Sequence, residues 1–384
     1  MHFEKELKEW GNGFKNKPIW VTAPGRINLI GEHTDYNNGF VFPAAIDKSV
    51  SFLLQLRDDK NCIIEAKDID AHLNFSIEDN LKPSSNSWEN YFLGVLHFLK
   101  KKGIMKKGFN AIFKSNIPIG AGMSSSAALS CGFGVALNEA FNLSLTKIQI
   151  AEVAQLAEHH FVGVKCGIMD QYACMFGIEN HALKLDCKTL KYQPQEIELG
   201  DYKLVLIDSK VKHELSSTEY NNRRDECNRA VEILKNYDGS INTLRDVSQN
   251  HLSNFGKYLD RVAYKRCKYV IMENERVEMA SQALNSNNLK LFGKLLNQSH
   301  EGLADYFEVS CDELNFLVDM SKRSEQVLGS RMMGGGFGGC TINIIAESNC
   351  DFVVNTIIDS YKKKFGIDAQ SYFVQIEDGC RVLN

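Results

Sequence analysis

The segment Pro118-Ile-Gly-Ala-Gly-Met-Ser-Ser-Ser-Ala-Ala128 joins a predicted strand at 108–114 to a helix expected to start near Ser124. Glycines at 120 and 122 let a backbone approach a ligand closely. The serines add hydroxyls at the helix start, where unpaired N–H groups and the positive end of the helix dipole favour phosphate. No lysine follows the glycines, so this is not a Walker loop. The segment predicts a phosphate-binding loop, although an ordinary serine-capped helix would share the pattern.

The elements on both sides of this loop follow each other irregularly. Strands are predicted at 18–23, 39–42, 49–56, 62–65, 108–114, 183–192, 202–208, 340–346 and 370–376, and the strand at 18–23 runs into a turn at Pro24-Gly25. Helices are predicted before residue 18 and at 88–101, 124–141, 146–161, 221–235, 264–285 and 289–306. This is an α+β distribution rather than the alternation of a doubly wound sheet. A boundary between 188 and 205 gives an N-terminal domain, 1–200, and a C-terminal domain, 201–384.

Composition and charge exclude several classes of protein. The chain has 384 residues, enough to bury a core without disulfide or metal staples. Forty-four Lys and Arg against 48 Asp and Glu leave no basic excess for nucleic acid or a membrane surface. The N-terminus lacks an apolar signal core, and no apolar run is long enough to span a membrane. The eleven cysteines are irregularly spaced without a C-x-x-C pair, which indicates reduced thiols and a cytoplasmic protein.

A second polar segment, Gly25-Arg-Ile-Asn-Leu-Ile-Gly-Glu-His-Thr-Asp-Tyr36, concentrates hydrogen-bonding side chains within twelve positions. Arginine, glutamate, histidine, aspartate and tyrosine can together hold the hydroxyls of a polyol. A solvated turn beside a capped helix would look the same, so the segment alone does not decide between the two interpretations.

Further candidates are scattered along the chain. Glu158 falls on the apolar face of its predicted helix, where a carboxylate needs a partner or a metal unless it reaches water at the edge. Asp170 has largely apolar neighbours and could be a helix cap. His159 and His160 diverge by about 100° around the helix, so they cannot both bind one metal and are expected to be structural. Five glycines in 334–339 make a turn that could line a ligand or allow close packing.

Three segments together resemble the GHMP small-molecule kinases and, within that superfamily, the galactokinase family. Residues 25–36 are similar to the galactokinase signature, 118–128 to the ATP loop of the superfamily, and 332–340 to its third motif. The matching order and spacing extend from about residue 18 to 380. The resemblance implies a two-domain α+β fold with the active site in the cleft between the domains. One departure is Met333, where the third motif commonly has threonine.

The resemblance also implies roles for individual residues. Arg26 and Asp170 resemble the catalytic pair, and Ser126 and Glu158 resemble the ligands of Mg²⁺. The expected sugar contacts are Glu32, His33, Thr34, Asp35, Asp170 and Tyr220. The expected ATP contacts are Gly120, Ala121, Gly122, Met123, Ser124, Ser125 and Ser126.

The implied reaction is transfer of the γ-phosphoryl of ATP to the anomeric hydroxyl of α-D-galactose, giving galactose 1-phosphate, the first step of galactose catabolism by the Leloir pathway. We expect a cytoplasmic monomer with galactose and MgATP as partners, and neither nucleic acid nor membrane. Two alternatives remain: a kinase for N-acetylgalactosamine, and a non-catalytic sensor of sugar and ATP. Ser126-Ala127 after the glycine loop argues against the sensor, because loss of this pair marks such proteins.

Overall fold

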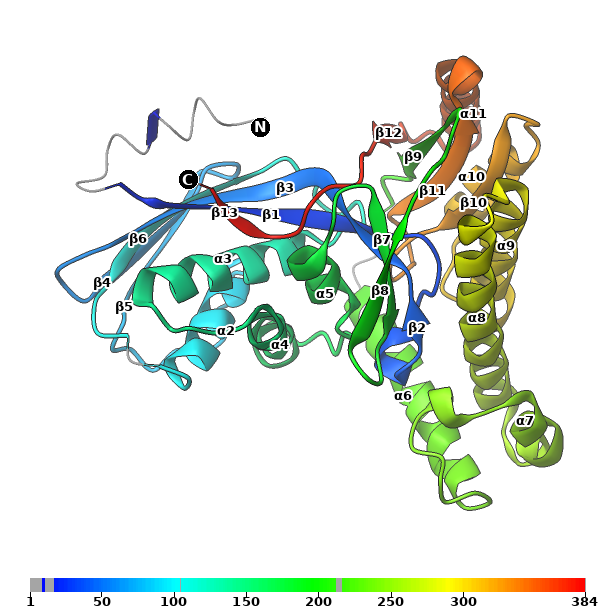
Figure 1. Ribbon diagram of the computed structural model, residues 1–384, viewed down its shortest axis with the longest axis horizontal. Helices are drawn as coiled ribbons and strands as arrows, with labels where there is room; N and C mark the ends of the chain where they lie inside the picture. Colours follow the sequence, from blue (N-terminus) through cyan, green and yellow to red (C-terminus); the bar gives the residue numbers. More distant parts are fainter. Residues whose placement is uncertain (1–8, 11–16, 104, 212–215, 384) are drawn as a thin grey trace.

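The computed structural model describes residues 9–10, 17–103, 105–211 and 216–383, without the side chains of 216 and 217. The helix predicted before residue 18 lies largely outside these ranges. A six-stranded sheet dominates the N-terminal half (Figure 1). Its order is β13 (Arg381–Leu383), β1 (Ile19–Asn28), β3 (Pro43–Leu56), β6 (Phe109–Ser115), β4 (Asn61–Ala66) and β5 (Ala71–Ser76). All neighbouring strands are antiparallel except β4 and β6.

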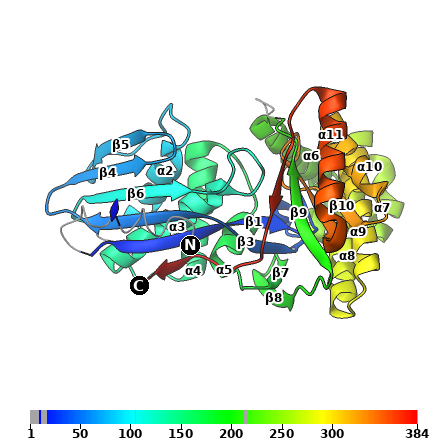
Figure 2. The same ribbon diagram turned by 90° about the horizontal axis from the view of Figure 1, so that it is seen from above.

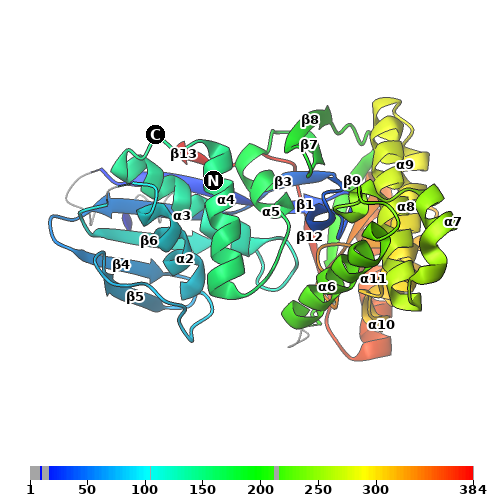
Figure 3. The same cartoon turned by 90° about the horizontal axis from the view of Figure 1, so that it is seen from below.

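Helices cover one face of this sheet, as Figure 3 shows from below. They are α2 (Glu89–Lys100), α3 (Ser125–Phe141), α4 (Lys147–Ala157) and α5 (Met169–Phe176). Helix α3 packs directly on β1 and β3. Small buried residues allow this approach: a Cβ added at Gly132 of α3 would lie 2.7 Å from the Cβ of Ala23 in β1. The start of α3 is thereby held beside β1, where the site lies.

The C-terminal half is built on a four-stranded antiparallel sheet, β10 (Val327–Met332), β11 (Cys340–Ala346), β9 (Tyr202–Asp208) and β12 (Gln370–Phe373). Its helices are α6 (Ser216–Lys235), α7 (Gln249–Phe255), α8 (Arg261–Asn285), α9 (Leu289–Gly302), α10 (Asp312–Lys322) and α11 (Cys350–Phe365). A small sheet of β2 (Phe40–Val41), β7 (His181–Asp186) and β8 (Lys191–Glu196) lies beside them. The expected α+β fold is confirmed.

The two halves share one hydrophobic core. A single cluster of buried side chains includes Phe52 of β3, Val277 of α8 and Ile342 of β11. The end of the chain also crosses back, because β13 pairs with β1, as Figure 2 shows from above. The division at residue 200 stays a prediction, and this last strand belongs to the N-terminal sheet.

Two predicted elements are wrong in detail. The strand predicted at 183–192 is the hairpin of β7 and β8, which turns at 187–190 with Leu190 in the left-handed region at φ 55°. Glycine, proline and asparagine, which usually mark a turn, do not occur there. The turn predicted at Pro24-Gly25 is instead a register shift within β1, which continues to Asn28. A bulge tolerates the missing N–H of a proline.

Candidate active site

A cavity of about 230 Å³ lies where the two polar segments of the sequence meet. Its walls come from β1 and the turn after it, α2, the start of α3, the end of α4, α5, α6 and the glycines after β10. The lining residues are Arg26, Glu32, His33, Asp35, Tyr91, Ser126, Glu158, Val164, Cys166, Gly167, Met169, Asp170, Tyr220, Gly334 and Gly335. Thr34 and residues 120–125 of the loop do not line it, whereas eight predicted residues share this one cavity: Arg26, Glu32, His33, Asp35, Ser126, Glu158, Asp170 and Tyr220.

Arg26 and Asp170, which both line the cavity, form a bidentate ion pair. The Nε and Nη2 of Arg26 donate to the two carboxylate oxygens of Asp170, both at 2.8 Å. The third arm, Nη1, donates to the Gly122 carbonyl at 2.5 Å. Arg26 is 5% exposed, whereas the Asp170 side chain keeps 25% of its surface open. The charge of the aspartate is thus compensated while one side of it stays accessible.

The glycine loop, which leads into α3, contacts this ion pair. Ser124 donates its hydroxyl hydrogen to Asp170 at 2.6 Å, so the loop and the signature segment hold the same carboxylate. Gly120, Gly122 and Ser124 all have positive φ, at 79°, 72° and 58°. The loop can come this close because Gly25 has no side chain: a Cβ there would lie 2.6 Å from the Met123 carbonyl oxygen.

The buried apolar residues of the loop present their backbone rather than their side chains. Ala121 and Met123 are buried in the core, which leaves only their main-chain groups for a ligand. The third motif faces the loop across a short gap, since a Cβ on Gly334 would lie 3.4 Å from the Gly122 carbonyl oxygen. Met333 is 1% exposed and packs in the same core, so its thioether occupies apolar space at the position where the motif commonly has threonine.

Glu158 provides a second carboxylate in the cavity. It begins the π-helical turn Glu158–Val162, an irregularity that often occurs at functional sites. Gln171 donates to its Oε1 at 2.7 Å, and Ser126 also hydrogen-bonds to it. Burial and the nearby charge of Asp170 raise the pKa of Glu158 to about 7. A buried carboxylate of this kind is stabilised by a cation.

These two residues fit a magnesium ion better than a transition metal. Within the described ranges, no group of three or more His, Cys, Asp or Glu side chains could hold a metal ion. Mg²⁺ needs only one or two protein ligands, because phosphate oxygens and water complete its octahedron. Ser126 and Glu158 supply such a partial set. His159 instead hydrogen-bonds to the Cys166 carbonyl, as expected for a structural histidine.

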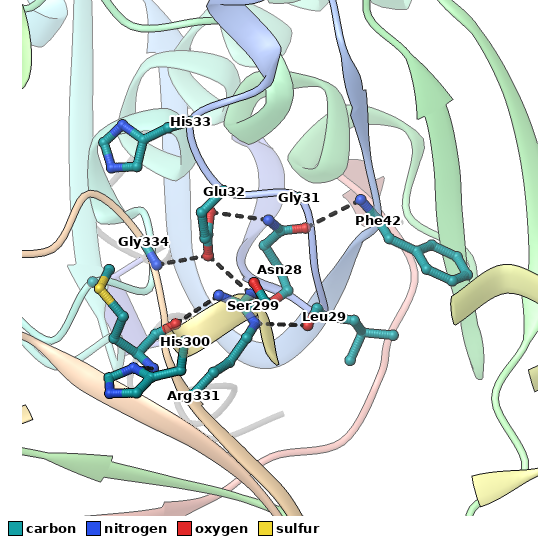
Figure 4. A network of polar contacts seen from close by, with 12 residues as sticks. Asn28, Leu29, Gly31, Glu32, His33, Phe42, Ser299, His300, Arg331 and Gly334 are labelled. Atoms are coloured by element: carbon teal, nitrogen blue, oxygen red, sulfur yellow. Dashed lines mark hydrogen bonds and ion pairs between the residues drawn. The ribbon is translucent and has the colours of Figure 1, made fainter. Parts of the chain in front are cut away.

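Glu32 lies in a dense buried network (Figure 4). Its Oε2 accepts from Asn28 at 2.9 Å, and its Oε1 accepts from Arg331 at 3.0 Å and from the Gly334 N–H at 2.8 Å. Glu32 is 1% exposed, yet it lines the cavity. The carboxylate is therefore fixed from both halves of the chain.

Thr34 and His33 were both predicted to contact the sugar, but the structure contradicts this for Thr34 and leaves no free ring nitrogen on His33. Thr34 is fully buried, outside the cavity lining, and its hydroxyl bonds to the Gly31 and Phe40 carbonyls, so it holds the turn rather than facing a sugar.

His33 lines the cavity, but both of its ring nitrogens are already hydrogen-bonded within the protein. Nε2 donates to the Gly335 carbonyl at 3.1 Å, and Nδ1 accepts from the Tyr36 hydroxyl at 2.9 Å. Burial lowers the pKa of His33 to about 3, so the ring stays neutral.

Asp35 and Tyr220, the remaining predicted sugar contacts, both line the cavity. Burial and the charge of Asp170 raise the pKa of Asp35 to about 7. Gly167 makes room for this carboxylate, because a Cβ there would lie 2.1 Å from Asp35 Oδ2. Tyr220 reaches the cavity from α6 and packs its ring 5.2 Å from that of His33.

Several residues of the site were not among the predicted ones. Tyr91 reaches the cavity from α2, and Asn28 and Arg331 hold Glu32 from positions that do not line it. Asn28 was within the quoted signature, and Arg331 directly precedes the third motif. An arginine beside an apolar strand was a usable signal, since buried arginines are nearly always paired. Tyr91 had no comparable signal, because an aromatic residue on an amphipathic helix usually packs in the core.

Comparisons with known proteins agree with this geometry. Residues 8–55 match the family model for the galactokinase galactose-binding signature, and residues 90–178 and 280–357 match those for the N-terminal and C-terminal domains of GHMP kinases. The chain is 40% identical to a galactokinase of Clostridium beijerinckii over 94% of each chain. It is also 40% identical to a galactokinase of Thermotoga maritima, over 94% of this chain and 99% of that one.

Solved structures extend the comparison to the fold. The Lactococcus lactis galactokinase complexed with galactose superposes with a TM-score of 0.94 at 34% identity, covering 99% of this chain and all of that one. The mevalonate kinase of Methanococcus jannaschii reaches a TM-score of 0.65 at 19% identity, over 97% of this chain and 100% of its own, which shows a shared fold alone.

Proposed function

The chain belongs to the galactokinase family of the GHMP kinases, and from this premise we propose that Arg26 and Asp170 carry the transfer of the ATP γ-phosphoryl to the anomeric hydroxyl of galactose. The products are galactose 1-phosphate and ADP. The observation that carries the assignment is the bidentate ion pair between Arg26 and Asp170, which both line the cavity. Arg26 also binds the Gly122 carbonyl and so joins this pair to the glycine loop.

Asp170 orients the anomeric hydroxyl and accepts its proton. Phosphoryl transfer depends mainly on alignment and charge neutralisation, so a positioned base beside a cation suits it. Arg26 holds both oxygens of the aspartate and faces the charge that develops on the phosphoryl oxygens. Ser124, which also donates to Asp170, fixes the carboxylate relative to the phosphate loop.

The sugar is held by Glu32, Asp35 and Tyr220, while His33 shapes the wall between them. ATP lies against the loop 120–126, whose main-chain N–H groups at the start of α3 face the phosphates. Ser126 and Glu158 hold the divalent metal that the kinase family uses, which we propose to be Mg²⁺. When bound, this ion neutralises phosphate charge and orients the phosphates.

We also propose that the protein works as a cytoplasmic monomer. The eleven cysteines are free thiols, as in a reducing compartment. Among the residues that the structure describes, no helix combines the length and apolar character needed to cross a membrane. Size-exclusion chromatography with light scattering tests the oligomeric state.

The deciding experiment is ADP release with MgATP and a panel of galactose, N-acetylgalactosamine, glucose and arabinose. We expect rapid release with galactose and slow release with the others. A preference for N-acetylgalactosamine would contradict the assignment of substrate. Binding of galactose without any ADP release would contradict the assignment of catalysis.

A further inference from the structure

The hydrogen bonds of Glu32 divide its two oxygens into different roles. A carboxylate offers about four acceptor sites, two on each oxygen. Oε1 already accepts from Arg331 and from the Gly334 N–H, so both of its sites are filled. Oε2 accepts only from Asn28 among the described contacts. One acceptor site on Oε2 therefore remains for a ligand in the cavity that Glu32 lines.

Arg331 is held in place as firmly as the carboxylate that it contacts. Its Nε donates to the Leu29 carbonyl at 2.8 Å, and its Nη1 donates to the carbonyl of the next residue, Met332, at 2.6 Å. Its Nη2 donates both to the Asn28 carbonyl and to Glu32. The side chain is fully buried at the end of β10 (Figure 4). One planar guanidinium thus binds the backbone at 28–29 and the side chain at 32 together.

Such a fork does more than balance a buried charge. A lysine ammonium is a single point with three donors on a flexible stem, so it cannot span two carbonyls and a carboxylate in one plane. Arg331 binds Oε1 of Glu32 and thereby fixes the direction in which Oε2, the second oxygen, points.

We infer that Arg331 is a positioning residue for the sugar: by occupying Oε1 with Gly334 it presents Oε2 of Glu32 to one hydroxyl of galactose. Arg331 does not line the cavity, so it acts through the groups that it holds, the Glu32 carboxylate and the backbone at 28–29. The inference rests on the proposed function, because it takes Glu32 as a sugar contact.

Two variants test this inference, one at each partner of the ion pair between Glu32 and Arg331. In Glu32→Gln, the two donors at Oε1 select the amide oxygen, so the NH₂ group takes the place of Oε2. It loses the hydrogen bond from Asn28 and meets a sugar hydroxyl as a donor instead of an acceptor. In Arg331→Lys, the charge stays but the planar fork is lost. A hydrogen bond to a charged group corresponds to a change of about tenfold or more, so we expect the galactose KM to rise at least about tenfold in both variants while the KM for ATP stays within about twofold.

Deoxygalactoses lacking one hydroxyl at a time give the decisive readout. The wild-type enzyme should discriminate against the sugar that lacks the hydroxyl bound by Glu32. In both variants, the ratio of activity with galactose to activity with that deoxygalactose should fall toward one. The corresponding ratios for the other deoxygalactoses should stay unchanged. A purely structural role of Arg331 would not single out one hydroxyl.

Arg266→Lys is the matched control. Arg266 is 2% exposed and also bonds a carboxylate, Glu226, and a carbonyl, Tyr306, but it does not line the cavity. We expect a similar loss of thermal stability with the wild-type pattern across the deoxygalactoses.

A wild-type pattern in Arg331→Lys would overturn the inference, and so would a loss spread equally over all the sugars. If Arg331→Lys does not fold, the pair Glu32→Gln with Arg331→Met replaces it, because it removes both charges. This double variant should match Glu32→Gln alone in galactose KM, whereas additive losses would overturn the inference. Absence of galactose-dependent ADP release in the wild-type enzyme would refute the proposed function instead.

Discussion

The segment at 26–36, with its turn, and the loop at 118–126 meet at Asp170, yet they are built in opposite ways. In the turn, Glu32, His33 and Thr34 are at most 3% exposed, and their side chains are bonded within the protein. In the loop, Ile119 is 71% exposed, and the backbone repeatedly adopts positive φ. The turn presents fixed side chains, whereas the loop presents main-chain groups together with the hydroxyls of Ser124 and Ser126.

This difference agrees with the ligand that we propose for each segment, the sugar for the turn and the phosphates of ATP for the loop. A sugar is distinguished by the direction of its hydroxyls, so its partners must be oriented acceptors and donors. A polyphosphate carries charge on every side, and backbone N–H groups at a helix start are sufficient for it. We therefore expect the turn to be sensitive to side-chain chemistry and the loop to backbone conformation.

The largest effect is expected at Asp170, where the two regions meet. Asp170→Asn removes the base, so kcat should fall at least about a thousandfold. Galactose binding, measured by calorimetry, should persist, because the turn keeps its own contacts. Asp186→Asn is the control, since Asp186 is similarly exposed and also paired with an arginine. Near-normal turnover of Asp170→Asn would contradict the assignment of the base.

A smaller effect is expected on the phosphate side at Glu158. Glu158→Gln keeps the shape and the contact with Gln171 but loses the charge available to a cation. The Mg²⁺ concentration for half-maximal activity should rise about 10- to 100-fold, with little change in galactose KM. Glu152→Gln on the same helix is exposed and serves as the control. An unchanged Mg²⁺ requirement would remove Glu158 from the metal site.

The backbone dependence of the loop is tested at Gly122. Its φ of 72° is strained for alanine by about 1–2 kcal/mol, although the added Cβ would have 3.5 Å to the nearest atom. We expect Gly122→Ala to raise the KM for ATP up to about 20-fold and to leave galactose KM unchanged. Gly366→Ala has the same backbone strain, with φ 70°, in open space far along the chain. Equal effects on both KM values would erase the contrast between loop and turn.

At Asp35, the expected effect is on stability rather than on activity, and it depends on pH. The pKa of Asp35 is raised to about 7 by burial and Asp170, so the folded state binds this proton more tightly than the unfolded state does. Its contribution to stability is complete below pH 3.8 and is lost as pH rises through 7, at most on the order of 4 kcal/mol. Asp35→Asn removes this loss, so its Tm should exceed that of the wild type at pH 8 and less so at pH 5.

Asp238→Asn provides the opposite sign for comparison. A hydrogen bond from Ser240 lowers the pKa of Asp238, so its contribution is present above pH 3.8 and this variant should be less stable than wild type at both pH values. An Asp35→Asn protein that is less stable at pH 8 than at pH 5, relative to wild type, would contradict the raised pKa.

Local patterns in the sequence predicted the α+β class and most elements well. The strand at 202–208 and the helix at 124–141 fall within a residue of β9 and α3, because alternating or helical periodicity reflects which face is buried. The hairpin at 183–192 was missed because its turn lacks turn-forming residues. The strand β13 is too short to have a pattern of its own and exists through its pairing with β1.

The sequence by itself determined which chemical groups the site has: an arginine and aspartate, the glycine loop, and Ser126 with Glu158. Only the tertiary structure decided which of them are free to act. It closed Arg26 on Asp170 across 144 positions, turned Thr34 away from the cavity, and set Arg331 against Glu32 across 299 positions. The physical reason is that periodicity records burial along one element, whereas the saturation of a buried polar group depends on donors brought by other elements.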